Sequence, residues 1–380
     1  MKLGLTIDLV CGVFLLGRMV ERFAVIMAGG KGERFWPASR TVRPKHLLPI
    51  VGDKPMLTQT VDRLDSLLPV ENIFVITNSE QVAGVREVCP NLPLENIVAE
   101  PVGRDTAAAV GLAMLLIKSR NPDAALAMLP ADAFIVDSAA FRGALDTAFQ
   151  AAEATESLVT IGIKPTEPAT GYGYINRGDV SSVIDGREVY SVKEFKEKPD
   201  SATAKVYVES GEYFWNAGMF VWQVKAIENA LARYTPVLME GLKAIETGLN
   251  AGTGLSELLA ELYPTLEKIS VDFAIMEKAD NVLTMAATFD WDDVGAWPAI
   301  ERHFPKDDRG NVVDGQGAFE DASGNIVVGK KDHLVALVGV DDLIVVQTAD
   351  ATLVCKKSEA QKIKNLVKSL GASGDYSSLL

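Results

Sequence analysis

Apolar and polar residues alternate in blocks along the first half of the chain, and these blocks predict strands and helices that take turns. Short apolar runs, which are typical of strands buried on both faces, fall at 23–28, 72–77, 96–99, 125–129 and 158–163. Apolar residues recur at helical spacing in the stretches between them, at 55–68, 80–88, 107–119 and 139–152. Asp105 or Thr106 can cap the third of these helices. Regular alternation of strand and helix predicts parallel βαβ units.

The pattern changes in the second half of the chain. Residues 171–175 alternate small and aromatic side chains, which favours either a β segment whose backbone abuts a ligand or a plain hairpin. Helices are then expected at 224–233, 236–248 and 255–262. A helix capped by Ser270 or Asp272 and a strand at 281–287 are expected to follow. From residue 309 onward, apolar runs separated by Gly and Asp predict strands at 311–313, 325–328, 333–338, 343–348 and 351–355. We expect a closing helix at 358–368 and a mobile tail after residue 371.

These patterns divide the chain into three parts. An α/β domain is expected at 23–304, and a small β-rich domain that ends in a helix is expected at 305–380. We expect residues 1–22 to form a poorly ordered extension, and Met19 is a candidate for the initiator methionine. The apolar run at 9–16 is too short to span a bilayer and lacks a clean cleavage site, so no membrane association is expected.

Composition narrows the class of protein. The 380 residues are 48% hydrophobic and 23% charged, as in a soluble globular protein. A formal net charge of −14 argues against binding to nucleic acid, because proteins that bind nucleic acid present a basic surface. Anionic substrates must therefore be attracted by local cations. The three cysteines, Cys11, Cys89 and Cys355, are far apart and lack metal-binding spacing. A reducing cytoplasm is therefore expected rather than a disulfide framework or a zinc site.

A glycine-rich turn follows the first predicted strand. The strand ends at Ala28 and opens directly into Gly29, Gly30, Lys31 and Gly32. Glycines let backbone N–H groups approach an anion closely, so this turn predicts a cradle for a polyphosphate. Cations gather just downstream, at Arg34, Arg40, Arg43 and Lys45. The alternative is a glycine-rich surface turn beside solvated cations.

Two common phosphate-binding loops do not fit this turn. Phe35 stands where the third small residue of a dinucleotide-binding loop belongs, which disfavours a nicotinamide oxidoreductase, and no Gly-Lys-Ser/Thr follows for a Walker A loop. The stretch instead resembles the nucleotidyltransferase signature of the sugar-nucleotide pyrophosphorylases. The resemblance lies in Gly-x-Gly-x-Arg, Phe-Trp-Pro and Pro-Lys, at 30–34, 35–37 and 44–45. The Phe-Trp-Pro form is similar to that of the members that make GDP-mannose.

Two aspartates are candidate metal ligands. Asp132 follows the strand predicted at 125–129, and ligands of open α/β sheets bind beyond the carboxyl ends of strands, where a carboxylate can hold a metal over phosphates. Asp293 lies in residues 291–297, which resemble the family's Trp-x-Asp-Val-Gly-Ser-Trp. Taken alone, Asp132 is equally consistent with an ordinary turn or cap, and Asp293 is more consistent with an ordinary acidic turn. As a pair they match Mg²⁺, which accepts one or two carboxylates together with substrate phosphates.

Further stretches resemble the same family in chain order. Residues 100–106 are similar to Glu-Pro-x-x-Arg-Asn-Thr, residues 195–199 to Phe-x-Glu-Lys-Pro, and residues 215–220 to Trp-Asn-Ser-Gly-Met-Phe. The chain departs from the family at Asp105, Ala133 and Ala217, where Asn, His and Ser are usual. The resemblance implies a base pocket made of Glu100, Arg104 and Thr106. It also implies a sugar site made of Gly173, Glu197 and Asn216, with Lys198 at the sugar phosphate.

The resemblance also implies a fold and a reaction. The fold would be α/β, a Rossmann-like (GT-A-like) mixed sheet flanked by helices in a nucleotidyltransferase domain, with a short β-helix-like module at the C-terminal end. In the reaction, mannose 1-phosphate would attack the α-phosphate of GTP in line, with Mg²⁺, to give GDP-mannose and pyrophosphate. Arg34, Lys45 and Lys198 would be catalytic, while Arg40 and Arg43 would be solvated cations. A homodimer is expected by resemblance.

Two other functions stay open. The chain could use another nucleotide or another sugar 1-phosphate, because the base pocket is identified only by resemblance. It could also be a non-catalytic homologue that senses GDP-mannose, an alternative to which Ala133 gives some weight. A second, isomerase activity on the same chain is not expected.

Overall fold

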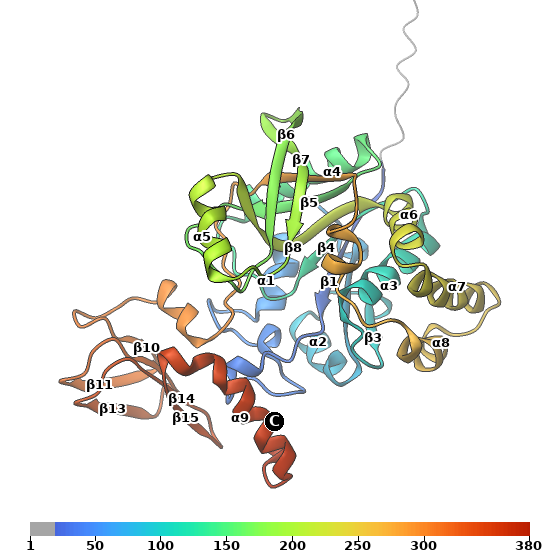
Figure 1. The fold of residues 1–380 in the computed structure, drawn as a ribbon. Coiled ribbons are helices and arrows are strands. Elements are labelled where there is room, and N and C mark those ends of the chain that lie inside the picture. The colour runs from blue at the N-terminus through green and yellow to red at the C-terminus, as the bar shows by residue number, and fades with distance from the viewer. Residues whose placement is uncertain (1–19) are drawn as a thin grey trace, which may run out of the picture.

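The computed structural model describes residues 20–380, and one large sheet dominates it (Figure 1). The expected extension at 1–22 falls almost entirely outside the described residues. Nine strands lie in the order β3-β2-β1-β4-β8-β5-β9-β7-β6, and β6 also pairs with β8. They are β1 (Arg22–Ala28), β2 (Ile73–Asn78), β3 (Ile97–Glu100), β4 (Ala125–Pro130), β5 (Leu158–Ile163), β6 (Tyr174–Ile184), β7 (Arg187–Lys196), β8 (Tyr213–Gln223) and β9 (Val282–Ala286).

The sheet is mixed, as expected. Strands β3, β2, β1 and β4 are parallel, in agreement with the βαβ units that the alternating pattern predicts. Strand β8 then runs antiparallel between β4 and β5, and the hairpin of β6 and β7 completes the far side. Because β1 and β4 are parallel neighbours, their carboxyl ends bring Ala28 and Asp132 to the same edge of the sheet.

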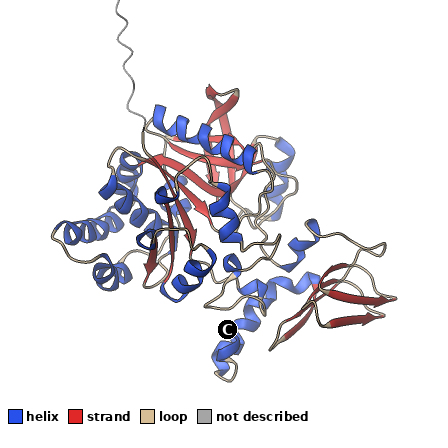
Figure 2. Cartoon of the chain, turned by 180° about the vertical axis from the view of Figure 1, so that it is seen from behind, coloured by secondary structure: helices blue, strands red, loops and turns tan. Residues whose placement is uncertain are grey.

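Helices cover both faces of the sheet (Figure 2). Successive residues of β1 face opposite sides: Phe23 and Val25 belong to one hydrophobic cluster, and Ala24 and Ile26 belong to the other. The first cluster takes in α3 (Asp105–Arg120), α6 (Val224–Tyr234), α7 (Pro236–Asn250) and α8 (Leu255–Leu262). The second takes in α1 (Met56–Arg63), α2 (Val82–Val88), α4 (Ser138–Ala154) and α5 (Ser201–Ser210).

One of two predicted helix caps is absent. We expected Asp105 or Thr106 to cap the helix after residue 106, but α3 begins at Asp105 itself, and neither side chain caps it. The Thr106 hydroxyl instead accepts a hydrogen bond from the backbone N–H of Val271 at 2.8 Å. The second predicted cap, from Ser270 or Asp272, precedes a short π-helix at Asp272–Met276, and the Ser270 hydroxyl accepts from the Phe273 N–H at 3.4 Å. The bond from the Val271 N–H to Thr106 ties the starts of these two helices to each other.

The C-terminal module is β-helix-like, as expected. Its strands are β10 (Val312–Asp314), β11 (Gln316–Glu320), β12 (Ile326–Val328), β13 (Leu334–Val338), β14 (Leu343–Gln347) and β15 (Thr352–Lys356). Parallel pairing of β10, β12 and β14 stacks successive coils of chain. Buried Asn311 and Asn325 repeat this stacking, since the Asn311 side-chain oxygen accepts from the Asn325 N–H and that of Asn325 accepts from the Leu343 N–H, both at 2.9 Å.

Strand β11 was missed because its side chains are mostly exposed and carry no apolar run. The closing helix also differs from its prediction. It is a 3-10 turn at Lys357–Lys362 followed by α9 (Ile363–Ser373), so it runs past the expected end at 368.

A third hydrophobic cluster joins the module to the segment after the glycine-rich turn. Phe35 and Trp36 of that segment pack with Trp297, and the same cluster includes Ile344 of β14 and Ile363 of α9. The Phe35 and Trp297 rings meet edge to face, with centroids 4.9 Å apart. The module therefore packs directly against the predicted phosphate cradle (Figure 1).

The tail after residue 371, which we expected to be mobile, instead contacts the same segment. The Leu379 carbonyl accepts a hydrogen bond from Trp36 Nε1 at 2.8 Å and a second one from Arg40. Arg40 also pairs with Asp350 at 2.8 Å, so the expectation that it is a solvated cation is wrong. Arg43 is more exposed, as expected, with only a 3.9 Å approach to Glu87.

Among residues 20–380, no helix has both the length and the apolar composition needed to cross a bilayer. Cys89 and Cys355 are free thiols.

We predict that Ile344→Ala will destabilise the protein by about 2–5 kcal/mol, because it leaves a cavity in the third cluster. Ile344 is fully buried there. Leu334→Ala in neighbouring β13 is the matched control: its side chain is 56% exposed, so we expect a change within about 0.5 kcal/mol. Urea unfolding curves of both variants measure the difference. Equal effects would contradict the packing role of the cluster.

Candidate active site

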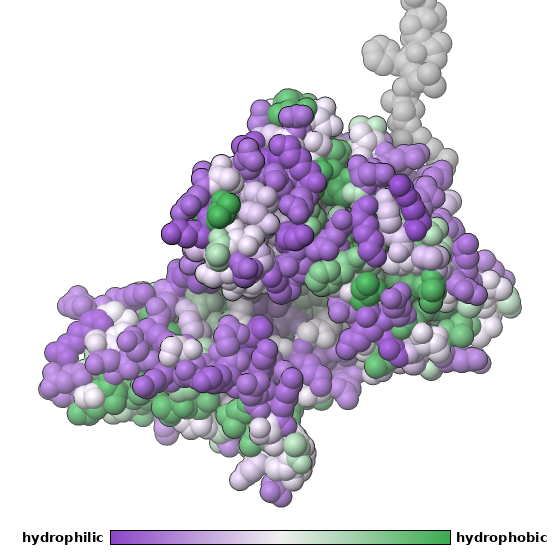
Figure 3. All heavy atoms as spheres, viewed as in Figure 1, coloured by the Kyte–Doolittle hydropathy of each residue, from purple (hydrophilic) through white to green (hydrophobic). Residues whose placement is uncertain are grey.

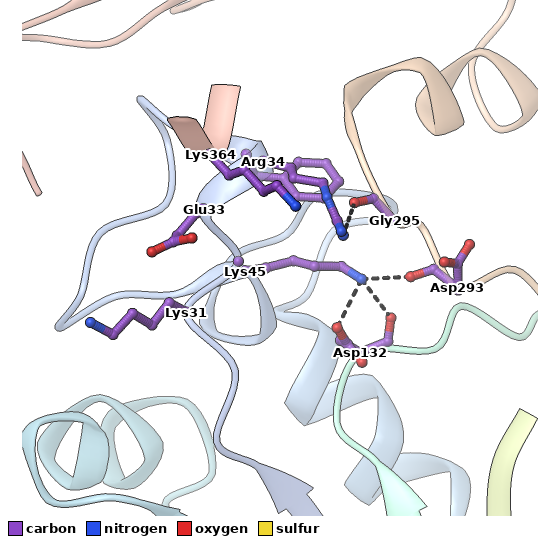
Figure 4. Close-up of a pocket in the computed structure, with 10 residues that line it drawn as sticks. Lys31, Glu33, Arg34, Lys45, Asp132, Asp293, Gly295 and Lys364 are labelled. Atoms are coloured by element: carbon purple, nitrogen blue, oxygen red, sulfur yellow. Dashed lines mark hydrogen bonds and ion pairs between the residues drawn. The ribbon is translucent and has the colours of Figure 1, made fainter. Parts of the chain in front are cut away.

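A pocket of about 420 Å³ lies at the carboxyl ends of β1 and β4 (Figure 4). Segments far apart in the sequence meet there: the turn after β1, the loop after β4, the loop after β9, and helix α9 of the module. The residues that line it are Lys31, Gly32, Glu33, Arg34, Phe35, Lys45, Asp132, Asp293, Gly295 and Lys364. The space-filling view shows a recess between the body of the sheet and the C-terminal module (Figure 3).

Gly32 brings two parts of the cradle into contact. Its backbone is left-handed, with φ of 62°, and a Cβ atom there would lie 2.5 Å from the Lys45 Cβ and 2.8 Å from the Lys45 backbone nitrogen. Only glycine fits this conformation and this spacing. The turn can therefore fold back onto Lys45, and the Ser39 hydroxyl secures it by donating to the Gly32 carbonyl at 2.7 Å.

Lys45 links the two candidate metal ligands. Its side chain is buried, and its ammonium group donates to the Asp132 carboxylate at 2.9 Å and to the Asp293 carbonyl at 2.6 Å. A third bond reaches the Asp132 carbonyl at 3.1 Å. A compact ammonium can satisfy all three acceptors at once. The structure thus places Lys45 between the loops that carry the two aspartates.

Asp293 is held in place by its neighbours. Its carboxylate accepts a hydrogen bond from the Tyr172 hydroxyl at 2.7 Å. Burial raises the pKa of Asp293, while the Tyr172 hydroxyl and the Lys45 ammonium counteract this effect. Adjacent Asp292 anchors the loop, because Arg302 donates to its carboxylate at 2.5 and 2.7 Å. The same carboxylate contacts the His303 ring at 2.7 Å.

Arg34 points into the pocket with part of its guanidinium group unpaired. One Nη donates to the Gly295 carbonyl at a long 3.4 Å. The Nε is buried and has no hydrogen-bond partner among the described residues. A buried donor without a partner is costly, so this guanidinium is suited to receive an anion. Lys31 lines the pocket from the glycine-rich turn (Figure 4).

The pocket offers carboxylates for a divalent cation but no complete cage. Among residues 20–380, no three His, Cys, Asp or Glu side chains are grouped to bind a metal. Asp132 and Asp293 nevertheless line one pocket beside the cations. Mg²⁺ typically takes one or two carboxylates and completes its coordination with water and substrate phosphates. The donor set therefore fits Mg²⁺ held jointly with a phosphate substrate.

Of the predicted base-pocket residues, Glu100 lies at the edge of the cradle. Glu100, the last residue of β3, is buried, and a Cβ on Gly29 would lie 3.4 Å from its carboxylate. Burial raises the pKa of Glu100, although the Tyr263 hydroxyl, which donates to its carboxylate, opposes the shift. Arg104 Nε is buried without a partner among the described residues. Glu100 is therefore available for polar recognition next to the glycine-rich turn.

The predicted sugar residues form a second cluster. A Cβ on Gly173 would lie 2.5 Å from the Glu197 carboxylate and 3.2 Å from the Asn216 Cβ. Lys198 pairs with Glu197 and is largely exposed. The Asn216 side-chain amide donates to the Asp272 carboxylate at 2.9 Å. Burial raises the pKa of Asp272 to about 6, and the nearby Glu197 carboxylate adds to the shift.

Tyr172 connects the predicted sugar residues to the pocket that contains Asp293. It precedes Gly173 in the chain, while its hydroxyl donates to Asp293 in the pocket. Its ring packs against Trp215 and Trp291, with centroids 4.9 and 5.5 Å away. The structure therefore joins the two groups of residues that the sequence identifies separately.

Comparisons with known proteins agree with this arrangement. Residues 23–309 match the model of the nucleotidyl transferase family, and residues 320–370 match that of the MannoseP isomerase/GMP-like beta-helix domain. Mannose-1-phosphate guanylyltransferases of Klebsiella pneumoniae and Escherichia coli are each 38% identical to the chain over 348 residues, 91% of this chain and 73% of theirs. The chain belongs to the mannose-1-phosphate guanylyltransferase family.

Solved structures support the fold of this guanylyltransferase family member. A Thermus thermophilus crystal structure, named as a mannose-1-phosphate geranyltransferase, is 36% identical with a TM-score of 0.82, and the match covers 93% of this chain and 100% of that one. A Helicobacter pylori mannose-6-phosphate isomerase structure, 21% identical, has a TM-score of 0.57 over 72% of this chain and 100% of that one. The second likeness concerns the fold alone. The expected mixed-sheet domain with a β-helix-like module is confirmed.

Two departures from the guanylyltransferase pattern have local explanations. Asp105 has φ of 65°, a conformation that Asn and Asp tolerate better than other non-glycine residues, so Asp can replace the usual Asn. Its carboxylate accepts from the Thr106 N–H at 2.8 Å. Ala133, in place of His, is buried in the second hydrophobic cluster, and its carbonyl accepts from Arg63 at 3.3 Å. Neither change removes a residue that lines the phosphate pocket.

Several residues of the candidate site could not be identified from the sequence of this guanylyltransferase family member. Tyr172 lies in the small–aromatic stretch that the sequence flags, but nothing there indicates a hydrogen bond to Asp293. The sequence around Asp272 indicates only a helix cap. Lys364 gives no local signal, because a lysine on an amphipathic helix is usually a solvated charge. Only the packing of α9 against the cradle reveals it.

We predict that Gly32→Ala will destabilise the protein by about 1–3 kcal/mol, because the new Cβ has no room against Lys45 and the backbone is left-handed. Gly30→Ala is the matched control for stability, since a Cβ there meets nothing within 4 Å. Thermal unfolding of both variants measures the effect. Equal melting temperatures would contradict the close approach of Gly32 to Lys45.

We predict that Asp272→Asn will become more stable relative to the wild type as pH rises. The pKa of Asp272 is about 6 in the folded protein and near 4 in an unfolded chain. Its contribution to stability is therefore present at low pH and lost as pH rises through 6. Between pH 4 and pH 7 the advantage of the variant should grow by about 1–2 kcal/mol, allowing for partial exposure.

Urea unfolding at several pH values measures this advantage. Asp280→Asn is the control: Arg233 lowers the pKa of that surface carboxylate, so its variant should lose stability relative to the wild type as pH rises. An advantage for Asp272→Asn that does not change with pH would contradict the raised pKa.

Proposed function

We propose that this protein makes GDP-mannose and pyrophosphate from GTP and mannose 1-phosphate, with Mg²⁺. The observation that carries the proposal is the shared pocket, in which Arg34 and Lys45 lie beside Asp132 and Asp293. Tyr172 connects this pocket to the cluster of Gly173, Glu197 and Asn216. The 38% identity to named guanylyltransferases over most of the chain supports the choice of substrates.

The reaction needs positioning and charge neutralisation more than covalent chemistry. An oxygen of the sugar phosphate attacks the α-phosphorus of GTP, a new P–O bond forms, and the bond to the β-phosphate oxygen breaks to release pyrophosphate. Arg34, Lys31 and the backbone amides of Gly30 and Gly32 hold the β- and γ-phosphates in this proposal. The unpaired Nε of Arg34 supports its role, since the charge that develops on the leaving group can satisfy it.

The remaining residues hold the metal and the second substrate. Asp132 and Asp293 would ligate Mg²⁺, which supplies charge neutralisation across the phosphates when bound. Lys45 neutralises the α-phosphate and Lys198 the phosphate of the sugar. The close approach of Gly173 to Glu197 supports a sugar site, because carboxylate and amide oxygens accept hydroxyl hydrogen bonds.

Guanine is recognised at the far end of the cradle in this proposal. Glu100, Arg104 and Thr106 form the base pocket, beside the nucleotide-binding turn from Ala28 to Gly32. The buried, unpaired Nε of Arg104 and the buried carboxylate of Glu100 supply a donor and an acceptor there. The proposal places the base on the β3 side and the sugar on the β8 side of the phosphates.

We expect a homodimer that works in the cytoplasm, on the strength of the sequence resemblance and of the wide spacing of the cysteines. Sedimentation velocity of the full chain tests the assembly, and a single monomeric species at micromolar concentration would overturn it.

We predict that a panel of nucleoside triphosphates, each offered with mannose 1-phosphate and Mg²⁺, will give pyrophosphate release with GTP at least tenfold faster than with the others. Preference for another nucleotide, or for another sugar 1-phosphate in a parallel panel, would support the related pyrophosphorylase reaction instead. Tight GDP-mannose binding with no turnover would support the sensing homologue. Removing divalent metal with a chelator should abolish release, and added Mg²⁺ should restore it.

We predict that Arg34→Ala will lower kcat by about 10²-fold or more with little loss of stability, because it removes a donor to the charge that develops in the transition state. Arg43→Ala is the matched control, since this arginine of the same segment is more than half exposed. Pyrophosphate release under saturating substrates measures both. Near-normal turnover in Arg34→Ala would show that its role is misassigned.

A further inference from the structure

Helix α9 of the C-terminal module places one lysine in the phosphate pocket. Lys364 lines that pocket together with Lys31, Arg34 and Lys45 of the cradle. Figure 4 shows the Lys364 side chain beside Arg34, with both directed into the cavity. This cation reaches the site from more than three hundred residues beyond the glycine-rich turn.

The surroundings of Lys364 leave its charge uncompensated. Within the described part of the chain, its ammonium group has no ion pair or hydrogen bond, whereas Lys362 on the preceding turn pairs with Glu359. Glu33 also lines the pocket but does not pair with Lys364. Placing two cations side by side is unfavourable unless an anion lies between them. The arrangement therefore calls for a negatively charged ligand.

The position of Lys364 in helix α9 also favours an anionic ligand. Lys364 is the second residue of α9, in the first turn, where the helix dipole disfavours a cation. A lysine there gains nothing from its own helix. Its placement is better explained by what it faces than by the stability of α9.

The helix that carries Lys364 is fixed against the cradle. Ile363, its neighbour, is buried in the third cluster with Phe35 and Trp297. Lys357, just before the helix, forms an ion pair with Glu301 in the segment that follows the metal-site loop. Val367, after Lys364 in the same helix, packs against the same cluster. The backbone of residue 364 is therefore held on both sides, and its side chain can reach only a limited part of the pocket.

We propose that Lys364 binds the β- and γ-phosphates of the nucleoside triphosphate and the pyrophosphate that leaves. The C-terminal module would thus complete the phosphate site rather than only support it. The inference rests on the proposed function, and it adds a binding residue from outside the nucleotidyltransferase domain. A compact ammonium suits a terminal phosphate, which carries the most charge and lies farthest from the sugar.

Loss of the Lys364 ammonium group should weaken the binding of some ligands and not of others. Lys364 should matter for ligands that contain the β–γ phosphate unit, namely GTP in the forward direction and pyrophosphate in the reverse direction. It should not matter for mannose 1-phosphate, whose proposed contacts are Glu197, Asn216 and Lys198. A merely structural role would instead affect both substrates or the stability of the protein.

The test compares Lys364→Met and Lys364→Arg with Lys368→Met in the full chain. Lys368 lies one turn further along α9 and outside the phosphate pocket, so its loss removes the same charge from the same helix. We expect Lys364→Met to raise KM for GTP and to weaken pyrophosphate inhibition by about tenfold, the scale of one charged hydrogen bond. KM for mannose 1-phosphate should change less than about twofold. Lys364→Arg should stay near the wild type, and Lys368→Met should match it.

A direct binding measurement separates this inference from the proposed function. Calorimetric titration of the wild type and Lys364→Met with inorganic pyrophosphate and Mg²⁺ requires no turnover. If no nucleotide supports catalysis but pyrophosphate affinity falls with Lys364→Met alone, the proposed function fails and the Lys364 assignment stands. If catalysis occurs and Lys364→Met leaves both KM for GTP and pyrophosphate affinity unchanged, the assignment fails alone. Failure of the wild type to bind pyrophosphate would also overturn the assignment.

Discussion

The buried ammonium group of Lys45 is the interaction on which the candidate site depends. It reaches the Asp132 carboxylate and the carbonyls of both aspartates, so one cation holds the loop after β4 against the loop after β9. A buried charge is tolerable only when it is paired and fully hydrogen-bonded, as this one is. Gly32 is required beside it because any side chain would displace the Lys45 backbone. The cradle and the aspartates therefore form one unit.

Much of this fold follows from local pattern. The parallel strands appear as continuous apolar runs because both of their faces are buried, and the glycine-rich turn is recognisable because it opens directly from such a run. Asp132 could be placed at the site because a carboxylate at a strand's carboxyl end has a defined location in an α/β sheet. Strand β11 could not be predicted, since its exposed side chains follow no apolar period.

The parts of the site that escaped prediction depend on contacts distant in sequence. The bond from Tyr172 to Asp293 joins residues from different loops, and no spacing rule encodes it. Asp272 looked like a cap because a short polar residue before an apolar run usually is one, whereas here it faces Asn216. The tail looked mobile by composition, yet the Leu379 carbonyl has partners in Trp36 and Arg40. In each case the partner, not the residue's own neighbours, determines its role.

The third hydrophobic cluster has a consequence for how this architecture can diversify. Phe35 and Trp36 of the cradle share one core with Ile344 and Ile363 of the β-helix-like module, so neither surface is complete without the other. A module taken from a relative would bring different side chains to this interface, the seam between module and cradle. Those side chains would have to pack against the aromatic rings of the cradle. Insertions should be accepted more readily in the exposed turns between coils than at the seam. The two parts are thus constrained to change sequence together, although they lie at opposite ends of the chain.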